Sequence, residues 1–432
     1  MRDMPRCLPE AGCSPPEPQR PYAREVTTNQ MPVEFDESAG EDQEEDQSAR
    51  GAYTQAVVHA TDWTTETLIA QLRRGNIALN PRFQRRDAWT VQQKSKFIES
   101  LVMGLPVPQI VLAESVDRRG SYLVLDGKQR LLSLLQYWGL GDGAKNRYAL
   151  SGLQILTHLN RKRLSDLEGE TTLEAELNAL LNQTIRTVVI KNWPDTDFLH
   201  LVFLRLNTGS VKLSPQELRQ ALLPGKYTDW VDEQASRSAA LQRLLNITEP
   251  DYRMRDVEVL ARFVAFRDFL NDYPGRMKRF MDTSFEALNS RWSLLGESGG
   301  EDAELAAGDT LRAFEASVAA LSTIFGLSEV ARKPGSRPFN RALFDLLAFY
   351  AQNDEIRRVM LSKPSKVKTA YAALFDNAAF VSAVDRDTAG LNNTALRLST
   401  WGDTLQAALG ITFPVPKVVS EGKNERIRFE GF

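Results

Sequence analysis

The residues best suited to chemistry lie in one short stretch, residues 126–130, which reads Asp-Gly-Lys-Gln-Arg. The apolar residues 122–125 come directly before it, and leucines at helical spacing follow directly after it. This pattern predicts a strand that ends at Asp-Gly and a helix that starts at once. The first backbone N–H groups of a helix lack partners within it and carry partial positive charge, so they favour an anion such as a phosphate. The turn is therefore the candidate anion site.

The side chains of this stretch suit the same ligand. Arg130 can donate two hydrogen bonds at once to a phosphate, and Gln129 can reach the same anion from the first helical turn. Asp126 is open to three interpretations: it could bind Mg²⁺, position an attacking water, or only cap the helix that follows an ordinary Asp-Gly turn. The residues alone favour the cap. No Gly-Lys is followed by Ser or Thr, and no Gly-x-Gly-x-x-Gly follows a strand, so neither common nucleotide loop is present.

Two further groups of basic and polar side chains precede this turn. Residues 80–86 form a predicted loop that contains Gln84, Arg85 and two more arginines, which favours a phosphate or nucleic-acid contact over a solvated turn. The next predicted helix, residues 91–104, has apolar residues at helical intervals and carries Lys94 on its polar side. Lys94 is therefore a candidate for the ligand face.

These blocks, taken in order, resemble the N-terminal domain of GmrSD-type restriction systems, within the wider ParB/sulfiredoxin-like group. The resemblance covers roughly residues 63–223. In the family's usual motif, Gln stands where this chain has Lys128. The blocks that carry the resemblance are Gln84-Arg85 before Trp89, residues 94–108 ending in Gly-Leu-Pro-Val-Pro, residues 126–130, Phe203-Leu-Arg-Leu-Asn-Thr-Gly209, Leu213-Ser214 and Glu217-Leu218.

The resemblance implies that a nucleoside triphosphate is bound and hydrolysed at the Asp-Gly turn. Asp126, Gln129 and Arg130 would be the catalytic residues, and Asp126 would hold Mg²⁺. Asn207 would tie the second block back to the pocket. The residues implied to bind the nucleotide or its phosphates are Gln84, Arg85, Lys94, Gly127, Lys128 and Asn207.

Histidine usage bears on whether the chain cuts DNA itself. GmrSD-like proteins often pair this domain with a His-containing nuclease domain. The three histidines, His59, His158 and His200, all precede the predicted helical C-terminal region, so composition excludes a His-based metal nuclease there. Glu421-Gly-Lys423 has the Glu-x-Lys form of another nuclease class but lacks a preceding Asp on a strand. We therefore expect a DNA-associated NTPase of restriction or phage defence whose cleavage is supplied by a separate nuclease subunit. The alternative is a ParB-like, nucleotide-switched DNA-binding module without significant turnover.

Net charge, cysteine content and the length of apolar runs limit the possible partners and cellular compartment of the protein. The chain of 432 residues carries a net charge of −3, but residues 1–50 hold 5 Arg and 12 acidic residues, so the rest carries +4, a balance that tolerates nucleic acid. The two cysteines, Cys7 and Cys13, cannot staple a core and fit a reducing cytoplasm. No apolar run is long enough to span a membrane. Nothing in the sequence fixes an oligomeric state.

Three regions are predicted from these patterns: residues 1–52 as a disordered acidic and Pro-rich tail, 53–225 as an α+β domain of ParB/sulfiredoxin-like type with a small mixed sheet, and 226–432 as an all-helical domain. An acidic arm that competes with nucleic acid is a second interpretation of the tail.

Arginines and lysines among the phenylalanines of residues 253–280 could form a phosphate-contacting face, while the aromatic rings form core. Within the α+β domain we expect helices at 64–73, 91–104, 127–138 and 195–206, and strands at 77–79, 109–113, 121–125 and 184–190, with the second and third of these strands paired as a hairpin. Residues 411–432 read as extended.

Overall fold

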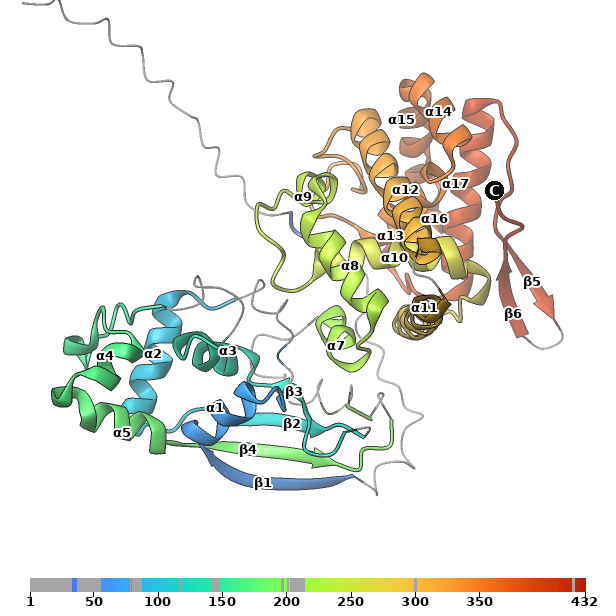
Figure 1. Cartoon of the computed structure of the whole chain (residues 1–432). Helices are drawn as coiled ribbons and strands as arrows, with labels where there is room; N and C mark the ends of the chain where they lie inside the picture. The colour runs from blue at the N-terminus through green and yellow to red at the C-terminus, as the bar shows by residue number, and fades with distance from the viewer. Residues whose placement is uncertain are drawn as a thin grey trace, which may run out of the picture. The chain divides into compact units, whose positions relative to one another are not determined.

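The structure, a computed structural model, describes residues 33–36, 56–77, 79, 88–116, 118–140, 148–195, 198–199, 202, 214–298, 301–421 and 424–432 (Figure 1). Contacts within the chain group residues 32–432 into one compact unit. Its elements fall into an α+β part, which ends near residue 195, and a helical part, which begins at residue 215. Together they confirm the predicted α+β class and the predicted helical C-terminal region.

The α+β part is built on a four-stranded mixed sheet with the order β1-β4-β2-β3. The central strands β2 and β4 are parallel, whereas β1 pairs with β4 and β3 pairs with β2 in antiparallel fashion. The predicted hairpin of the second and third strands is thus confirmed. The strand bounds are β1 Val57–Thr64, β2 Ile110–Glu114, β3 Tyr122–Asp126 and β4 Thr184–Lys191.

Strand β1 is not expected from the sequence, and the predicted strand at 77–79 is reduced to one bridge. Apolar residues do not alternate along β1, because it is an exposed edge strand whose backbone pairs with β4 from Val57–Lys191 to Thr64–Thr184. Ile77 makes an isolated bridge to Tyr122. Backbone pairing with a distant partner, rather than local pattern, therefore decides both places.

Capping residues fix the starts of the first two helices. Helix α1, Thr65–Arg73, begins after Thr64, whose hydroxyl accepts from the N–H of Thr67 at 3.1 Å. Helix α2, Val91–Val102, begins after Thr90, which forms a reciprocal capping box with Gln93. Such caps satisfy backbone donors that a helix cannot satisfy by itself. Both helices start within a residue or so of where the sequence predicts them.

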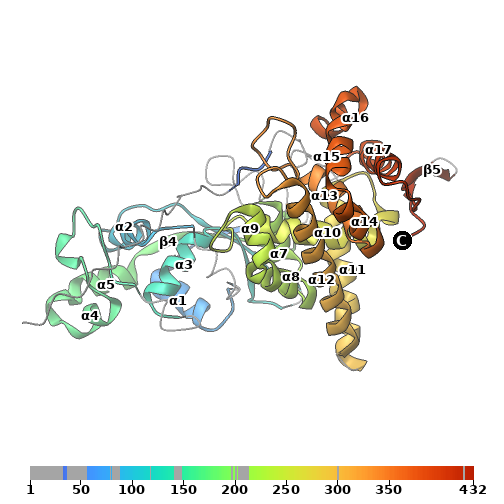
Figure 2. The same ribbon diagram turned by 90° about the horizontal axis from the view of Figure 1, so that it is seen from above.

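Helices α1, α2 and α3 (Lys128–Tyr137) cover one face of the sheet (Figure 1). Side chains of β2 point alternately to the two faces: Ile110 and Leu112 pack under these helices, while Val111 and Ala113 join a smaller cluster on the other face. Burial on both faces is typical of a central parallel strand. Helix α5 (Glu174–Asn182) packs against α1 and α2 at one end of this layer, and α4 (Leu164–Gly169) packs against α5 (Figure 2).

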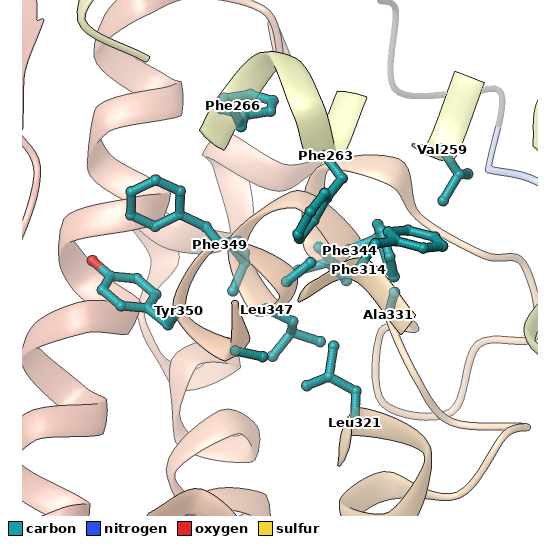
Figure 3. Packing of buried hydrophobic residues seen from close by; sticks show 14 of the residues in the cluster. Val259, Phe263, Phe266, Phe314, Leu321, Ala331, Phe344, Leu347, Phe349 and Tyr350 are labelled. Atoms are coloured by element: carbon teal, nitrogen blue, oxygen red, sulfur yellow. The ribbon is translucent and has the colours of Figure 1, made fainter. Parts of the chain in front are cut away.

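The helical part is organised around α10, α12 and α13, which contact one another. Their aromatic side chains interlock, including Phe263 with Phe314 and Phe314 with Phe344, in the core drawn in Figure 3. The helix bounds are α7 Pro215–Leu222, α8 Lys226–Arg237, α9 Ala239–Leu245, α10 Arg255–Phe269, α11 Met277–Ser298, α12 Glu301–Phe325, α13 Arg341–Ala351, α14 Asp354–Ser362, α15 Pro364–Ala373, α16 Ala378–Asp385 and α17 Leu391–Leu409.

Two details correct the predicted domain organisation. The C-terminal region is not all-helical, because β5 (Lys417–Glu421) and β6 (Asn424–Arg428) form an antiparallel hairpin, within the segment that the sequence predicts to be extended. Residues 33–36, predicted to belong to the disordered tail, instead pack on the helical part. Phe35 is buried between the guanidinium groups of Arg255 and Arg341, each 4.9 Å from its ring centre. The rest of the predicted tail lies outside the described residues.

Candidate functional site

The candidate site is the turn between β3 and α3, and Gly127 determines its shape. Gly127 has φ of +96°, a left-handed conformation that side-chain-bearing residues rarely adopt. A Cβ at this position would lie 3.0 Å from Cγ1 of Ile110 and 3.4 Å from Nε of Arg130. Only glycine therefore lets the strand pass directly into α3 while β2 packs against the turn. Among the described residues, no side chain caps the start of α3.

Asp126 and Arg130 are paired across this turn. One carboxylate oxygen of Asp126 accepts from the backbone N–H of Gly127 at 2.7 Å, and the other accepts from Nη2 of Arg130 at 3.0 Å. The same Nη2 donates to the carbonyl of Gln109 at 2.9 Å. The Asp126 side chain is 30% exposed and that of Arg130 12% exposed. Asp126 thus both stabilises the turn and positions Arg130, while solvent still reaches its carboxylate.

Two buried polar atoms at the turn have no hydrogen-bond partner among the described residues. They are Nε of Arg130 and Oε1 of Gln129. A buried polar atom left unpaired costs about 1–3 kcal/mol, and most such atoms in folded proteins are satisfied. The described residues thus leave one donor and one acceptor of this turn without a partner.

The side chain of Lys128 binds a residue of α7, whereas that of Arg130 binds Asp126 within the turn. Nζ of Lys128 donates to Oε1 of Glu217 at 3.1 Å, and both side chains are buried. The other oxygen of Glu217 accepts from the backbone N–H of Ser214 at 2.9 Å, as the Ser-x-x-Glu pattern predicts for a capping box. Glu217 therefore caps α7 and also holds the first residue of α3. The sequence showed only the cap, because nothing local to residues 214–217 indicates a partner 89 positions away.

The other predicted contacts are only partly described. Lys94 lies in α2 and is buried, with its Nζ 5.9 Å from the ring centre of Tyr148. Gln84, Arg85 and Asn207 lie outside the described residues, as does most of the predicted helix at 195–206. The structure thus brings Asp126, Gly127 and Arg130 into contact, with Lys128 turned toward α7, while it shows no contact of the Gln129 side chain with them.

Comparison with protein families bears on this turn directly. Residues 65–224 match the family model described as the GmrSD restriction endonuclease, N-terminal domain. This segment is a GmrSD-type N-terminal domain. No curated protein and no solved structure matches the chain. The GmrSD-type domain spans α1 to α7, and so includes the Asp126–Arg130 turn together with both members of the Lys128–Glu217 pair.

Whether the GmrSD-type domain could hold a metal depends on its carboxylates. Among the described residues, no group of three or more His, Cys, Asp or Glu side chains is placed to bind a metal ion. Mg²⁺ usually needs only one or two carboxylates and takes its other oxygens from substrate phosphates and water. The single, partly exposed carboxylate of Asp126 fits this ligand set, but it does not fit an all-protein metal cage.

Two basic residues of 253–280, Arg255 and Arg262, are held in ion pairs within the helical part, which counts against their predicted place on a phosphate-contacting face. Arg262 is fully buried and pairs with Asp345, with Glu258 3.8 Å away. Arg255 is bound to Asp251 at 2.6 Å. The phenylalanines among them belong to the core, as expected. In the part of the chain that the structure describes, no helix has the length and apolar character to cross a membrane.

Proposed function

We propose that the GmrSD-type domain binds a nucleoside triphosphate at the start of α3 and hydrolyses it, within a DNA-restriction or phage-defence system. The observation that carries the proposal is the glycine turn at residue 127. An uncapped helix start lies there beside an unpaired guanidinium N–H and an unpaired amide oxygen. Helix starts of this kind favour phosphates because their N–H groups and dipole point at the ligand.

Each side chain of the turn has a distinct role in this proposal. Arg130 shifts from Asp126 toward the phosphates, where its remaining N–H donors offset developing charge. The carboxylate of Asp126 is then available to a phosphate-bound Mg²⁺, which would supply charge neutralisation when present, or to the attacking water. Gln129 orients that water or a phosphate oxygen. Gln84, Arg85, Lys94 and Asn207 remain further proposed contacts, whereas the side chain of Lys128 acts through Glu217.

The alternative is a nucleotide switch for DNA association, with binding but little turnover. The Lys128–Glu217 pair favours it, because this pair joins the first residue of α3 to α7. Arg219 of α7 in turn pairs with Asp282 of α11 at 2.7 Å. A ligand at α3 could thus shift contacts that reach the helical part. In either case DNA is the proposed partner, and a separate nuclease subunit would supply cleavage.

Phosphate release by the purified protein, measured with each nucleoside triphosphate and Mg²⁺ in the presence and absence of DNA, tests the proposal. Asp126→Ala and Arg130→Ala should each lower the rate on the order of 10³-fold. Asp62→Ala and Arg186→Ala provide a matched control, because they break an exposed ion pair on the same sheet. These controls should retain the wild-type rate.

Nucleotide binding, measured separately, distinguishes the two candidate functions. Tight binding without release in the wild type would establish the switch and remove the hydrolase. Release that persists unchanged in both Asp126→Ala and Arg130→Ala would exclude the turn from the mechanism. Thermal melting of each variant confirms that the fold is intact.

A further inference from the structure

A second candidate site lies in the helical part, outside the GmrSD-type domain. It is an open cleft of about 920 Å³ bordered by α10, α12, the start of α14 and the chain that follows β6. The side chains that matter most for its chemistry are Arg267, Arg312, Arg357, Phe429 and Phe432. Three guanidinium groups and two aromatic rings therefore border one hollow.

The arginines differ in how strongly the protein already holds them. Arg357 is committed, because its Nη1 donates to the carbonyls of Ala351 and Gln352 at the end of α13. The Arg312 side chain is 67% exposed and, among the described residues, pairs only with Asp309 of the same helix, an arrangement worth little in water. The side chain of Arg267 makes no hydrogen bond to the described residues, and its Nε lies 3.9 Å from a carboxylate oxygen of Asp268. Arg267 and Arg312 can thus turn to a ligand at small cost.

The aromatic border is fixed in place. Asn271 donates to the carbonyl of Phe429 at 3.0 Å and accepts from its N–H at 2.7 Å. The centre of the Phe432 ring lies 4.9 Å from the centre of the Phe429 ring and 5.3 Å from that of Phe349. Phe432 nevertheless remains 45% exposed. A large ring that is anchored on one side and open on the other offers a stacking surface for a planar ligand.

We propose that this cleft binds a nucleotide unit, with its phosphate on Arg267 and Arg312 and its base against Phe432. Planar bases stack on aromatic rings whatever their sequence, and arginine donates two bonds to a phosphate. The three arginines are balanced by Asp309, Asp354 and Glu430 in the same border. A bare phosphate therefore gains little, and affinity requires the base as well. The nucleotide is either free or part of a nucleic-acid strand.

Binding of a labelled short oligothymidylate, followed by fluorescence anisotropy, tests this proposal. Arg267→Gln and Phe432→Ala should each weaken binding about tenfold. Phe432→Tyr keeps an aromatic ring and should bind as the wild type does. Arg291→Gln is the matched control, because Arg291 also lies 3.9 Å from Asp268 but does not border the cleft. It should bind as the wild type does. Competition by thymidine monophosphate indicates a free nucleotide, whereas binding of the oligonucleotide without such competition indicates a strand.

Repeating the titration with Asp126→Ala protein separates this cleft from the turn at α3. The proposal predicts that oligonucleotide binding persists in that variant, even if nucleotide turnover does not. The proposal is overturned if neither the oligonucleotide nor thymidine monophosphate binds the wild type, if Arg267→Gln and Arg291→Gln lose equally, or if inorganic phosphate competes as well as the nucleotide does.

Discussion

Gly127 illustrates how one residue can shape a site without contacting a ligand. Its left-handed backbone turns the chain from strand to helix within one position, and Ile110 of the neighbouring strand closes over the place where a side chain would be. The Asp126–Arg130 pair depends on this turn, since Asp126 precedes the glycine and Arg130 lies in the helical turn that follows it. The chemistry proposed for these side chains therefore requires a backbone that only glycine adopts without strain.

Replacing Gly127 by alanine should destabilise the protein by about 1–3 kcal/mol, because it combines a positive φ with the contact to Ile110. Gly75→Ala is the control for the first of these effects, since Gly75 has φ of +68° and nothing within 4 Å of its added Cβ. The denaturant midpoints of the two variants measure the difference. Equal losses of stability would show that Ile110 simply moves aside and that the turn is not tight.

At the level of helices, the important contact joins α3 to α7. Lys128 and Glu217 are both buried, and Glu217 also caps α7. A buried charge that loses its partner costs far more than an exposed one, because water no longer compensates it.

Lys128→Met should cost about 3–5 kcal/mol, because it leaves the buried Glu217 carboxylate without its counter-charge. Adding Glu217→Gln should recover much of that loss, since glutamine keeps an acceptor for the N–H of Ser214. A double-mutant cycle by urea unfolding measures the coupling. The exposed pair Lys162–Glu170 is the control and should show at most about 1 kcal/mol. A coupling equally small at Lys128–Glu217 would contradict the proposed link from α3 to α7.

For the protein as a whole, buried tyrosines connect the folded core to pH. Burial raises the pKa of Tyr137, Tyr227, Tyr350 and Tyr371 above the ordinary value, with nearby carboxylates adding to the effect for the first three. The unfolded chain loses these protons near pH 10, while the folded protein keeps them. The unfolded state then binds fewer protons, so the free energy of unfolding falls as pH rises above about 10.

Tyr227 allows this linkage to be measured at one residue. Its hydroxyl is buried without a partner among the described residues, and its ring packs against Phe285 and Trp292. Tyr227→Phe should therefore leave stability at pH 7 unchanged or raise it by about 1 kcal/mol, and should make its decline above pH 10 shallower. Urea unfolding across this pH range tests both effects. Tyr350→Phe is the contrast, because it loses a 2.8 Å hydrogen bond to Leu398 and should destabilise at pH 7.

Local patterns predicted the turn together with its flanking strand and helix, because each depends on residues only a few positions apart. Tertiary structure alone decided the pairing of β1 with β4, the burial of Phe35 between two arginines, and the turning of Lys128 toward Glu217. These contacts join residues far apart in the chain, where neither periodicity nor spacing specifies a partner. The folded structure also determines how firmly each charged side chain is held. The guanidinium of Arg267, 3.9 Å from its carboxylate partner, is the loosely held one that we propose binds a phosphate.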